Sequence, residues 1–222
     1  DLYDYCDGDS VRTKKKKAQK MRAKFHYPIL ISGFIGSGKS TLARHLAKQF
    51  GLKYVSASEL HRALVLERMK KEAKRAKKIQ KGFWESEAGK KGMKIRSTNL
   101  EIDKEVDVRL LKVLNKNTHC VTDARLMPWL YKKKALRIWL TASERERSSR
   151  VGLRDDITPS MARLCIRERM KMDQKIWKNL YGIKMGKDLS PFDLVLNNDT
   201  YSAQETFNVV RAFIDGKILR SY

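Results

Sequence analysis

The chain has 222 residues, of which 41% are hydrophobic, enough for one α/β domain with a complete core. Its 49 lysines and arginines outnumber 25 acidic residues, and the resulting net charge of +24 attracts polyanions such as nucleic acid or phosphorylated substrates. The three cysteines lack metal-ligand spacing, and no apolar run approaches the roughly 20 residues of a membrane span. We therefore expect a cytoplasmic protein with neither a disulfide framework nor a membrane span.

The first 24 residues differ in composition from the rest of the chain. Residues 1–10 are acidic, whereas residues 11–24 carry eight basic residues and no acidic one. Because like charges at this density repel one another, residues 1–24 are predicted to form a flexible arm that is basic in its second half. A single globular domain is expected over residues 25–222.

A phosphate-binding motif follows the first strand candidate. The short apolar run at residues 27–32 predicts a buried parallel strand, and the helical spacing of apolar residues over Thr41–Phe50 predicts a helix that ends at Gly51. Between them, Gly33–Ser40 fits the pattern G-x-x-x-x-G-K-[ST] without a mismatch. Because the glycines and the helix N-terminus turn backbone N–H groups towards one centre, this segment predicts a nucleoside triphosphate site.

The motif assigns roles to individual residues. We expect Lys39 to reach the β- and γ-phosphates, and the hydroxyl of Ser40 to ligate Mg²⁺. Asp123, at the end of a later strand candidate, is expected to hold the same ion, usually through water. ATP and Mg²⁺ are therefore the expected cofactors. Nucleotide contacts are predicted at Gly33, Gly36, Ser37, Gly38, Lys39, Ser40 and Thr41.

The next part of the chain reads as a strand followed by helices. Residues 52–55 predict a short strand, and Ser58 is a candidate cap for a helix that begins at Glu59. Residues 68–96 hold twelve basic and three acidic residues, and we predict a helical excursion with a mobile tip there. Apolar residues at helical spacing predict a further helix over Glu101–Leu114.

The second half of the chain alternates strand and helix patterns. Strands are expected at 118–123, 136–140 and 192–196, and helices at 143–150, 158–180 and 202–215. Strands that alternate with helices indicate a parallel sheet with helices on both faces. The predicted fold class is therefore α/β: a P-loop fold with a central parallel five-stranded sheet flanked by helices, and a helical excursion.

The motif alone does not separate kinases from GTPases or motor ATPases. The chain has no guanine-reading N-K-x-D segment at a strand end, and it is too short for the long ATPases. Several arginines are spaced through its second half. Because phosphoryl transfer spreads negative charge over the equatorial oxygens, closing arginines are the expected catalysts of a small kinase.

A family resemblance narrows the choice of acceptor. It extends over about residues 28–215. The segments that carry it are the phosphate loop, Val55–Arg62, Asp103–Asp107, Asp123–Arg125 with Pro128-Trp129, Arg150–Asp155, Arg169–Asp173, and residues 181–183 and 188–194. In these segments the sequence resembles the archaeal-type cytidylate kinases, within the nucleoside monophosphate kinases. The resemblance implies transfer of the γ-phosphoryl group of ATP to a nucleoside monophosphate, most plausibly CMP or dCMP.

The resemblance also implies roles for the arginines. Arg62 and Arg125 would grip the acceptor phosphate, and Arg169 with Asp173, one helical turn apart, would hold the acceptor nucleotide. Arg150 and Arg154 would belong to a lid at about residues 144–175, and residues 60–115 would form the monophosphate-binding insertion. The implied catalytic residues are Lys39, Arg125, Arg150 and Arg154. The alternative for each arginine is a surface charge, and for Arg169–Asp173 an exposed helix pair.

Two other functions fit parts of the sequence. A kinase-like protein of an RNA or ribonucleoprotein assembly would use the basic residues 11–24 and 68–96, with Phe83 and Trp84 stacking on bases. Its nucleotide site would be structural or idle. A kinase of another small acceptor is the third possibility, although residues 55–59 lack the Asp-x-Asp of shikimate-type kinases.

Overall fold

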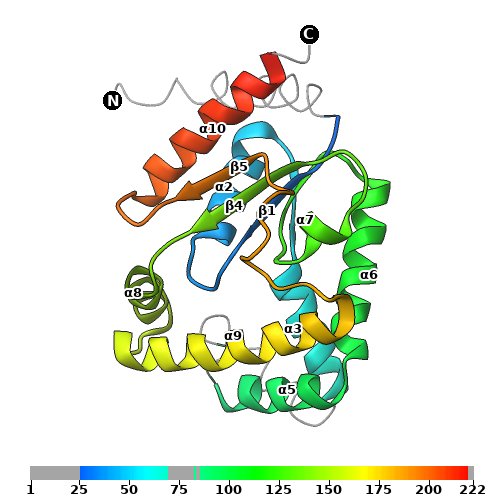
Figure 1. Ribbon diagram of the computed structural model, residues 1–222, viewed down its shortest axis with the longest axis vertical. Coiled ribbons are helices and arrows are strands. Elements are labelled where there is room, and N and C mark those ends of the chain that lie inside the picture. The colour runs from blue at the N-terminus through cyan, green and yellow to red at the C-terminus, as the bar shows by residue number, and fades with distance from the viewer. Residues whose placement is uncertain (1–25, 70–82, 84–85, 220–222) are drawn as a thin grey trace, which may run out of the picture.

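The computed structural model describes residues 26–69, 83 and 86–219, so the predicted arm at 1–24 lies outside the described residues (Figure 1). Within the described part, five parallel strands form one sheet in the order β2-β3-β1-β4-β5, as the α/β prediction requires. The strands are β1 (Ile29–Gly33), β2 (Lys53–Ser56), β3 (Cys120–Asp123), β4 (Leu136–Thr141) and β5 (Leu194–Asn197).

Helices cover both faces of this sheet because side chains along each strand alternate between the faces. On one face, Ile29 and Ile31 of β1 pack with α2 (Lys39–Phe50) and α10 (Ala203–Leu219). On the other face, Leu30 packs with α3 (Ala57–Arg68), α6 (Glu101–Lys116) and α7 (Met127–Leu130). These two apolar layers make β1 the fully buried centre of the domain.

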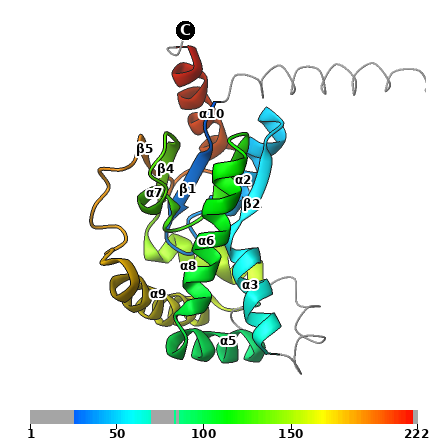
Figure 2. The same ribbon diagram turned by 90° about the vertical axis from the view of Figure 1, so that its right-hand side faces the viewer.

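Three more helices lie at the carboxyl end of the sheet. They are α5 (Glu87–Thr98), α8 (Glu144–Asp155) and α9 (Pro159–Tyr181). Figure 1 shows the carboxyl ends of β4 and β5 directed towards α8, and Figure 2 shows α5 and α9 together at the end of the molecule opposite α10. Helix α5 also contacts α3. In doubly wound folds, ligands bind at this edge of the sheet, so these helices bound the expected site.

The start of α3 corrects one prediction. The helix begins at Ala57, two residues before the predicted start, and its cap is Ser56 rather than Ser58. The Ser56 hydroxyl accepts a hydrogen bond from the backbone N–H of Glu59 at 3.3 Å. The sequence Ser56-x-x-Glu59 is a capping-box pattern, so the correct cap was readable from the sequence.

The basic excursion at 68–96 is described only in part. Ser86 caps α5, and residues 70–82, 84 and 85 lie outside the described residues, Trp84 among them. Phe83 is 4% exposed and belongs to the apolar cluster beneath α3 and α6. This burial gives no support to the prediction that Phe83 stacks on RNA bases. Among the described helices, none has the length and apolar character to cross a bilayer.

Candidate active site

The phosphate loop between β1 and α2 has a backbone shape that only glycine permits. Gly33 has φ 144°, and a Cβ there would lie 2.2 Å from the carbonyl oxygen of Leu140. Gly38, immediately before α2, has φ 91°. Positive φ angles of this size are strained for residues with a side chain. The loop therefore turns tightly enough to direct its amides at one centre at the N-terminus of α2, where an anion is favoured.

Lys39 lies at this centre. Its Nζ donates a hydrogen bond to the carbonyl oxygen of Phe34 at 2.7 Å, across the mouth of the loop. Burial, reinforced by the positive charge of Arg125, lowers the pKa of Lys39 to about 7. The site thus holds an excess of positive potential, and a bound polyphosphate would favour the charged ammonium.

Ser40 and Asp123 meet beside Lys39. The Ser40 hydroxyl donates a hydrogen bond to Oδ2 of Asp123, which ends β3 next to β1. Asp123 Oδ1 is buried and accepts no hydrogen bond of good geometry from the described residues, although Tyr54 and Ser56 lie beside the carboxylate. Burial raises the pKa of Asp123. The Lys39 ammonium and the Ser40 hydroxyl both act against this effect of burial.

Arg125 occupies the opposite side of the centre. Its guanidinium pairs with Asp173 of α9 and lies over the Trp177 ring, 4.9 Å from the ring centroid. The Ser32 hydroxyl fixes the backbone here by donating to the carbonyl of Arg125 at 2.6 Å. Nε of Arg169 lies 4.0 Å from Oδ2 of Asp173. The carboxylate of Asp173 thus orients two arginines that line the cleft.

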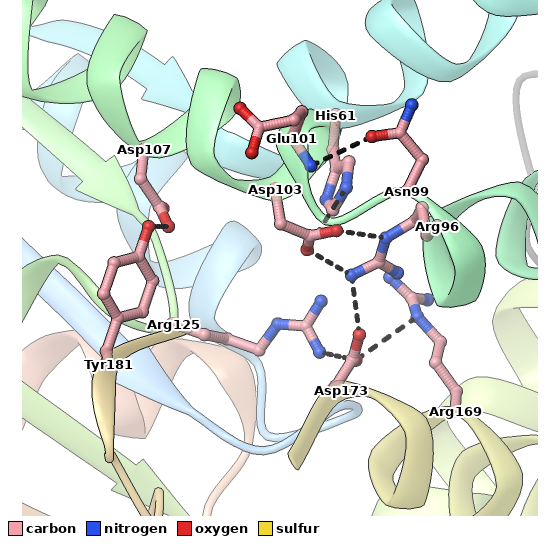
Figure 3. A network of polar contacts seen from close by, with 10 residues as sticks. All are labelled: His61, Arg96, Asn99, Glu101, Asp103, Asp107, Arg125, Arg169, Asp173 and Tyr181. Atoms are coloured by element: carbon pink, nitrogen blue, oxygen red, sulfur yellow. Dashed lines mark hydrogen bonds and ion pairs between the residues drawn. The ribbon is translucent and has the colours of Figure 1, made fainter. Parts of the chain in front are cut away.

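That carboxylate belongs to a buried charge network that Figure 3 shows in full. Arg96, which is fully buried on α5, donates to Asp103 of α6 at 2.7 and 3.2 Å and to Asp173 at 2.8 Å. His61 of α3 has Nε2 at 3.6 Å from Asp103. Burial alone would raise the pKa of Asp173, but the guanidinium groups of Arg125, Arg96 and Arg169 hold it well below its usual range.

The arginines of α8 face the phosphate loop from the other side. Arg150 donates to the side chain and to the carbonyl of Asn198, at 3.1 and 2.7 Å, and Asn198 donates in turn to the Ser37 carbonyl at 3.0 Å. Arg154 is half exposed and pairs with Asp155 at 2.5 Å. Arg147 donates to the carbonyls of Ile35 and Ala142, each at 3.1 Å, and so joins α8 to the loop.

All these elements border one cleft of about 890 Å³. Lys39, Ser40, Thr41, Gly36, Gly38, Asp123, Arg125, Arg62, Arg150, Arg154 and Arg169 line it, as the predicted site residues should. Three predicted residues lie behind the lining: Gly33 and Ser37 within the loop, and Asp173, which is 0% exposed. Arg62 has its guanidinium over the Phe83 ring at 4.9 Å.

A cleft that joins a phosphate loop to several arginines narrows the possible families, and the sequence comparison decides between them. The model of the "Cytidylate kinase-like family" matches residues 28–200. The chain belongs to this family. The fold and the family resemblance predicted from the sequence are both confirmed.

Individual relatives agree with the family assignment. The cytidylate kinase of Pyrococcus abyssi is 36% identical over 187 residues, covering 84% of this chain and 93% of the relative. That of Methanocorpusculum labreanum is 32% identical over 192 residues, covering 86% and 98%. Shikimate kinase from Acinetobacter baumannii, solved in complex with shikimate, has a TM-score of 0.51 at 15% identity, covering 89% of this chain and 98% of that chain. This last likeness concerns the fold alone.

Three residues that join the elements around the cleft were not among the predicted site residues: Arg96, Asp103 and Arg147. Arg96 lies in the basic segment 68–96, which was predicted to be a helical excursion with a mobile tip. A signal was nevertheless present, because Gly89, Gly92 and Arg96 share a helical face, and glycines on that face let α5 pack closely against its neighbours. All three residues of this face are buried.

Proposed function

We propose that the protein transfers the γ-phosphoryl group of ATP to CMP or dCMP. The observation that carries this proposal is the meeting of two anion sites in one cleft: the phosphate loop with Lys39, and the arginine pair Arg125 and Arg169. One site suits the triphosphate and the other suits a monophosphate placed opposite it. The names of the archaeal relatives support cytidylate as the acceptor.

Catalysis in this proposal is positioning and charge neutralisation, because phosphoryl transfer needs little covalent chemistry from the protein. The loop amides and Lys39 bind the β- and γ-phosphates. Arg125 and Arg62 bind the acceptor phosphate, with Arg169 beside them. Asp173 acts from behind the cleft lining, since its carboxylate pairs with Arg125 and Arg169 and orients both.

Residues 144–175 act as the lid in this proposal, and residues 60–115 as the acceptor-binding insertion. Arg150 and Arg154 stand on α8, at the donor side of the cleft. Closure of α8 over the triphosphate would bring both guanidinium groups against the transferring phosphoryl group and exclude water. Asn198 links Arg150 to the carbonyl of Ser37, so the lid already contacts the phosphate loop at this point.

The residues present suit Mg²⁺. Ser40 Oγ and the Asp123 carboxylate form a hard-oxygen donor pair, and the buried Oδ1 of Asp123 calls for a cation. The described residues contain no cluster of three or more metal-ligating acidic, His or Cys side chains, in keeping with an ion held mainly by phosphates and water. When bound, Mg²⁺ neutralises charge on the β- and γ-phosphates.

The prediction of an RNA or ribonucleoprotein partner through residues 11–24 and 68–96 stays a prediction. Most of these residues lie outside the described part of the chain, and Phe83, which is described, is buried. A shikimate-type acceptor has no support beyond the shared fold.

A coupled ADP-release assay tests the proposal. Purified protein is supplied with ATP, Mg²⁺ and, in turn, CMP, dCMP, UMP or AMP, with Lys39→Ala as the control variant. We expect turnover that depends on the monophosphate, that is greatest with CMP or dCMP, and that Lys39→Ala loses by about 100-fold or more. Absence of monophosphate-dependent turnover contradicts the proposed reaction, and activity that survives in Lys39→Ala reveals a contaminant.

A further inference from the structure

One carboxyl group of the cleft has no part in the machinery described so far. Asp107 of α6 lines the cleft one helical turn beyond Asp103. The hydroxyl of Tyr181, at the end of α9, donates to its Oδ2 at 2.8 Å (Figure 3). No other side chain or backbone group among the described residues donates to this carboxyl group.

The other acidic residues that line the cleft are already engaged. Glu59 pairs with Arg44, and Glu146 pairs with Arg150. Asp103 is held by Arg96, and Asp123 by Ser40. Glu59, Glu146 and Asp103 each pair with a cation, whereas the partner of Asp107 is a neutral phenol. Asp123 lies beside the phosphate loop, whereas Asp107 lies away from it.

The surroundings of Asp107 suit a flat heterocycle. Val106 and Leu110 of α6 line the cleft on either side of it, and Trp177 lines it one turn before Tyr181 on α9. Apolar walls around a few placed polar groups are the usual composition of a base pocket. Arg125, which we assign to the acceptor phosphate, lies over Trp177, so this wall is continuous with the phosphate subsite.

We infer that Asp107, oriented by Tyr181, is the group that distinguishes cytosine from uracil in the acceptor nucleotide. The inference rests on the proposed function and names a residue for its substrate selectivity. Cytosine presents an N4 amino donor where uracil presents an O4 acceptor, and a carboxylate accepts a hydrogen bond from the former and repels the latter.

Selectivity should then depend on ionisation of Asp107. Burial raises the pKa of Asp107 to about 7, against the opposing effect of the Tyr181 hydrogen bond. Asp103 on the same helix raises it further, while Arg125 and Arg96, from the loop after β3 and from α5, lower it. A neutral carboxyl group can donate through its O–H and accept through its C=O, so it tolerates either pyrimidine. Only the ionised form discriminates.

The test compares CMP with UMP in the wild-type protein and three variants across pH 6 to 8, by kcat/KM and by equilibrium binding. In the wild type, the CMP-to-UMP ratio should rise with pH through about 7, to about tenfold or more. The CMP-to-UMP ratio cancels any ionisation that affects both substrates equally, such as that of Lys39. In Asp107→Asn the ratio should fall towards one and lose its pH dependence, because an amide both donates and accepts.

Two further variants sharpen the result. Tyr181→Phe removes the hydrogen bond that favours the ionised form, so the midpoint of the ratio should move to higher pH. Asp215→Asn, at a partly exposed position of α10 that does not line the cleft, is the matched control and should keep the wild-type profile. If the CMP-to-UMP ratio is unchanged in Asp107→Asn, the inference is overturned and the kinase function stays intact. If Asp107→Asn does not fold, an unmoved midpoint in Tyr181→Phe overturns the inference in the same way. Wild-type protein that binds but does not phosphorylate either nucleotide contradicts the proposed function, and its binding ratio still tests Asp107.

Discussion

The guanidinium of Arg96 lies 2.8 Å from the carboxylate of Asp173, so an ion pair joins α5 to a helix 77 residues further along the chain. Both residues are buried, and Asp173 also pairs with Arg125, which lines the cleft. The packing of three helices and the orientation of a cleft-lining arginine therefore depend on the same carboxylate. A charge that composition alone assigns to the surface is part of the core of the site.

Replacing Arg96 with leucine should destabilise the fold by about 3–5 kcal/mol, because removal of one partner leaves buried charge uncompensated. Asp103 would lose its principal cation, and Asp173 would keep only Arg125 and Arg169. Urea unfolding followed by circular dichroism at neutral pH measures the change in the free energy of unfolding.

Arg109→Leu is the matched control for Arg96→Leu. Arg109 pairs with Glu105 on the same helix and is 47% exposed, so its loss should cost no more than about 1 kcal/mol. Equal effects of the two substitutions would show that the Arg96 network contributes no more than a surface pair.

The fold was largely predictable from local sequence, for a physical reason. Strands buried on both faces are short continuous apolar runs, so residues 27–32 and 136–140 located β1 and β4 to within two residues. The order of the strands was not predictable, because β3 inserts between β1 and β2 through pairings that span about 90 residues of chain. Strand order is a property of long-range pairing rather than of any segment.

The residues of the candidate site were likewise predictable only where they depend on local sequence. The phosphate loop is contiguous, so its residues were found together, and Asp123 was found because it ends a strand candidate. Arg96 and Asp103 were missed as a pair because Arg96 acts at a position where composition is basic and its partners lie on other helices. Local charge counts carry no information on which lysine or arginine faces inward.

Binding of ATP should be coupled to proton uptake through Lys39. Its pKa of about 7 leaves the amine mostly neutral at pH 8 in the free protein. A polyphosphate beside it favours the charged form and raises this pKa, so each ATP bound at pH 8 should take up about one proton. Calorimetry with magnesium-free ATP in two buffers of different ionisation enthalpy gives the number directly.

The Lys39→Arg variant distinguishes proton uptake at position 39 from the presence of a positive charge there. Arginine keeps a cation at this position but stays protonated at pH 8, so proton uptake should disappear while some ATP affinity remains. If the variant takes up as many protons as the wild type, Lys39 is not the group that titrates. The number of protons taken up is also diagnostic, since a lysine with an ordinary pKa would exchange almost no protons at pH 8.

Arg147 should matter for ATP rather than for the acceptor. Its guanidinium holds the carbonyls of Ile35 and Ala142 and lies 5.4 Å from the centroid of the Phe34 ring, so it clamps the loop from α8. Arg147→Ala removes both hydrogen bonds and leaves the glycine turn free to relax. We expect the dissociation constant for ATP to rise by about 10- to 100-fold, equivalent to about 1–3 kcal/mol.

Binding of CMP provides the internal reference for this variant, because Arg125 and Arg169 do not contact Arg147, and CMP affinity should change by no more than about twofold. Arg145→Ala, an exposed arginine on the same helix, controls for the loss of a positive charge near the triphosphate. Equal losses of ATP affinity in the Arg147 and Arg145 variants would mean that α8 acts on ATP through its net charge alone. A loss confined to Arg147→Ala assigns the effect to the clamp on the loop, since Arg147 donates to the loop carbonyl of Ile35.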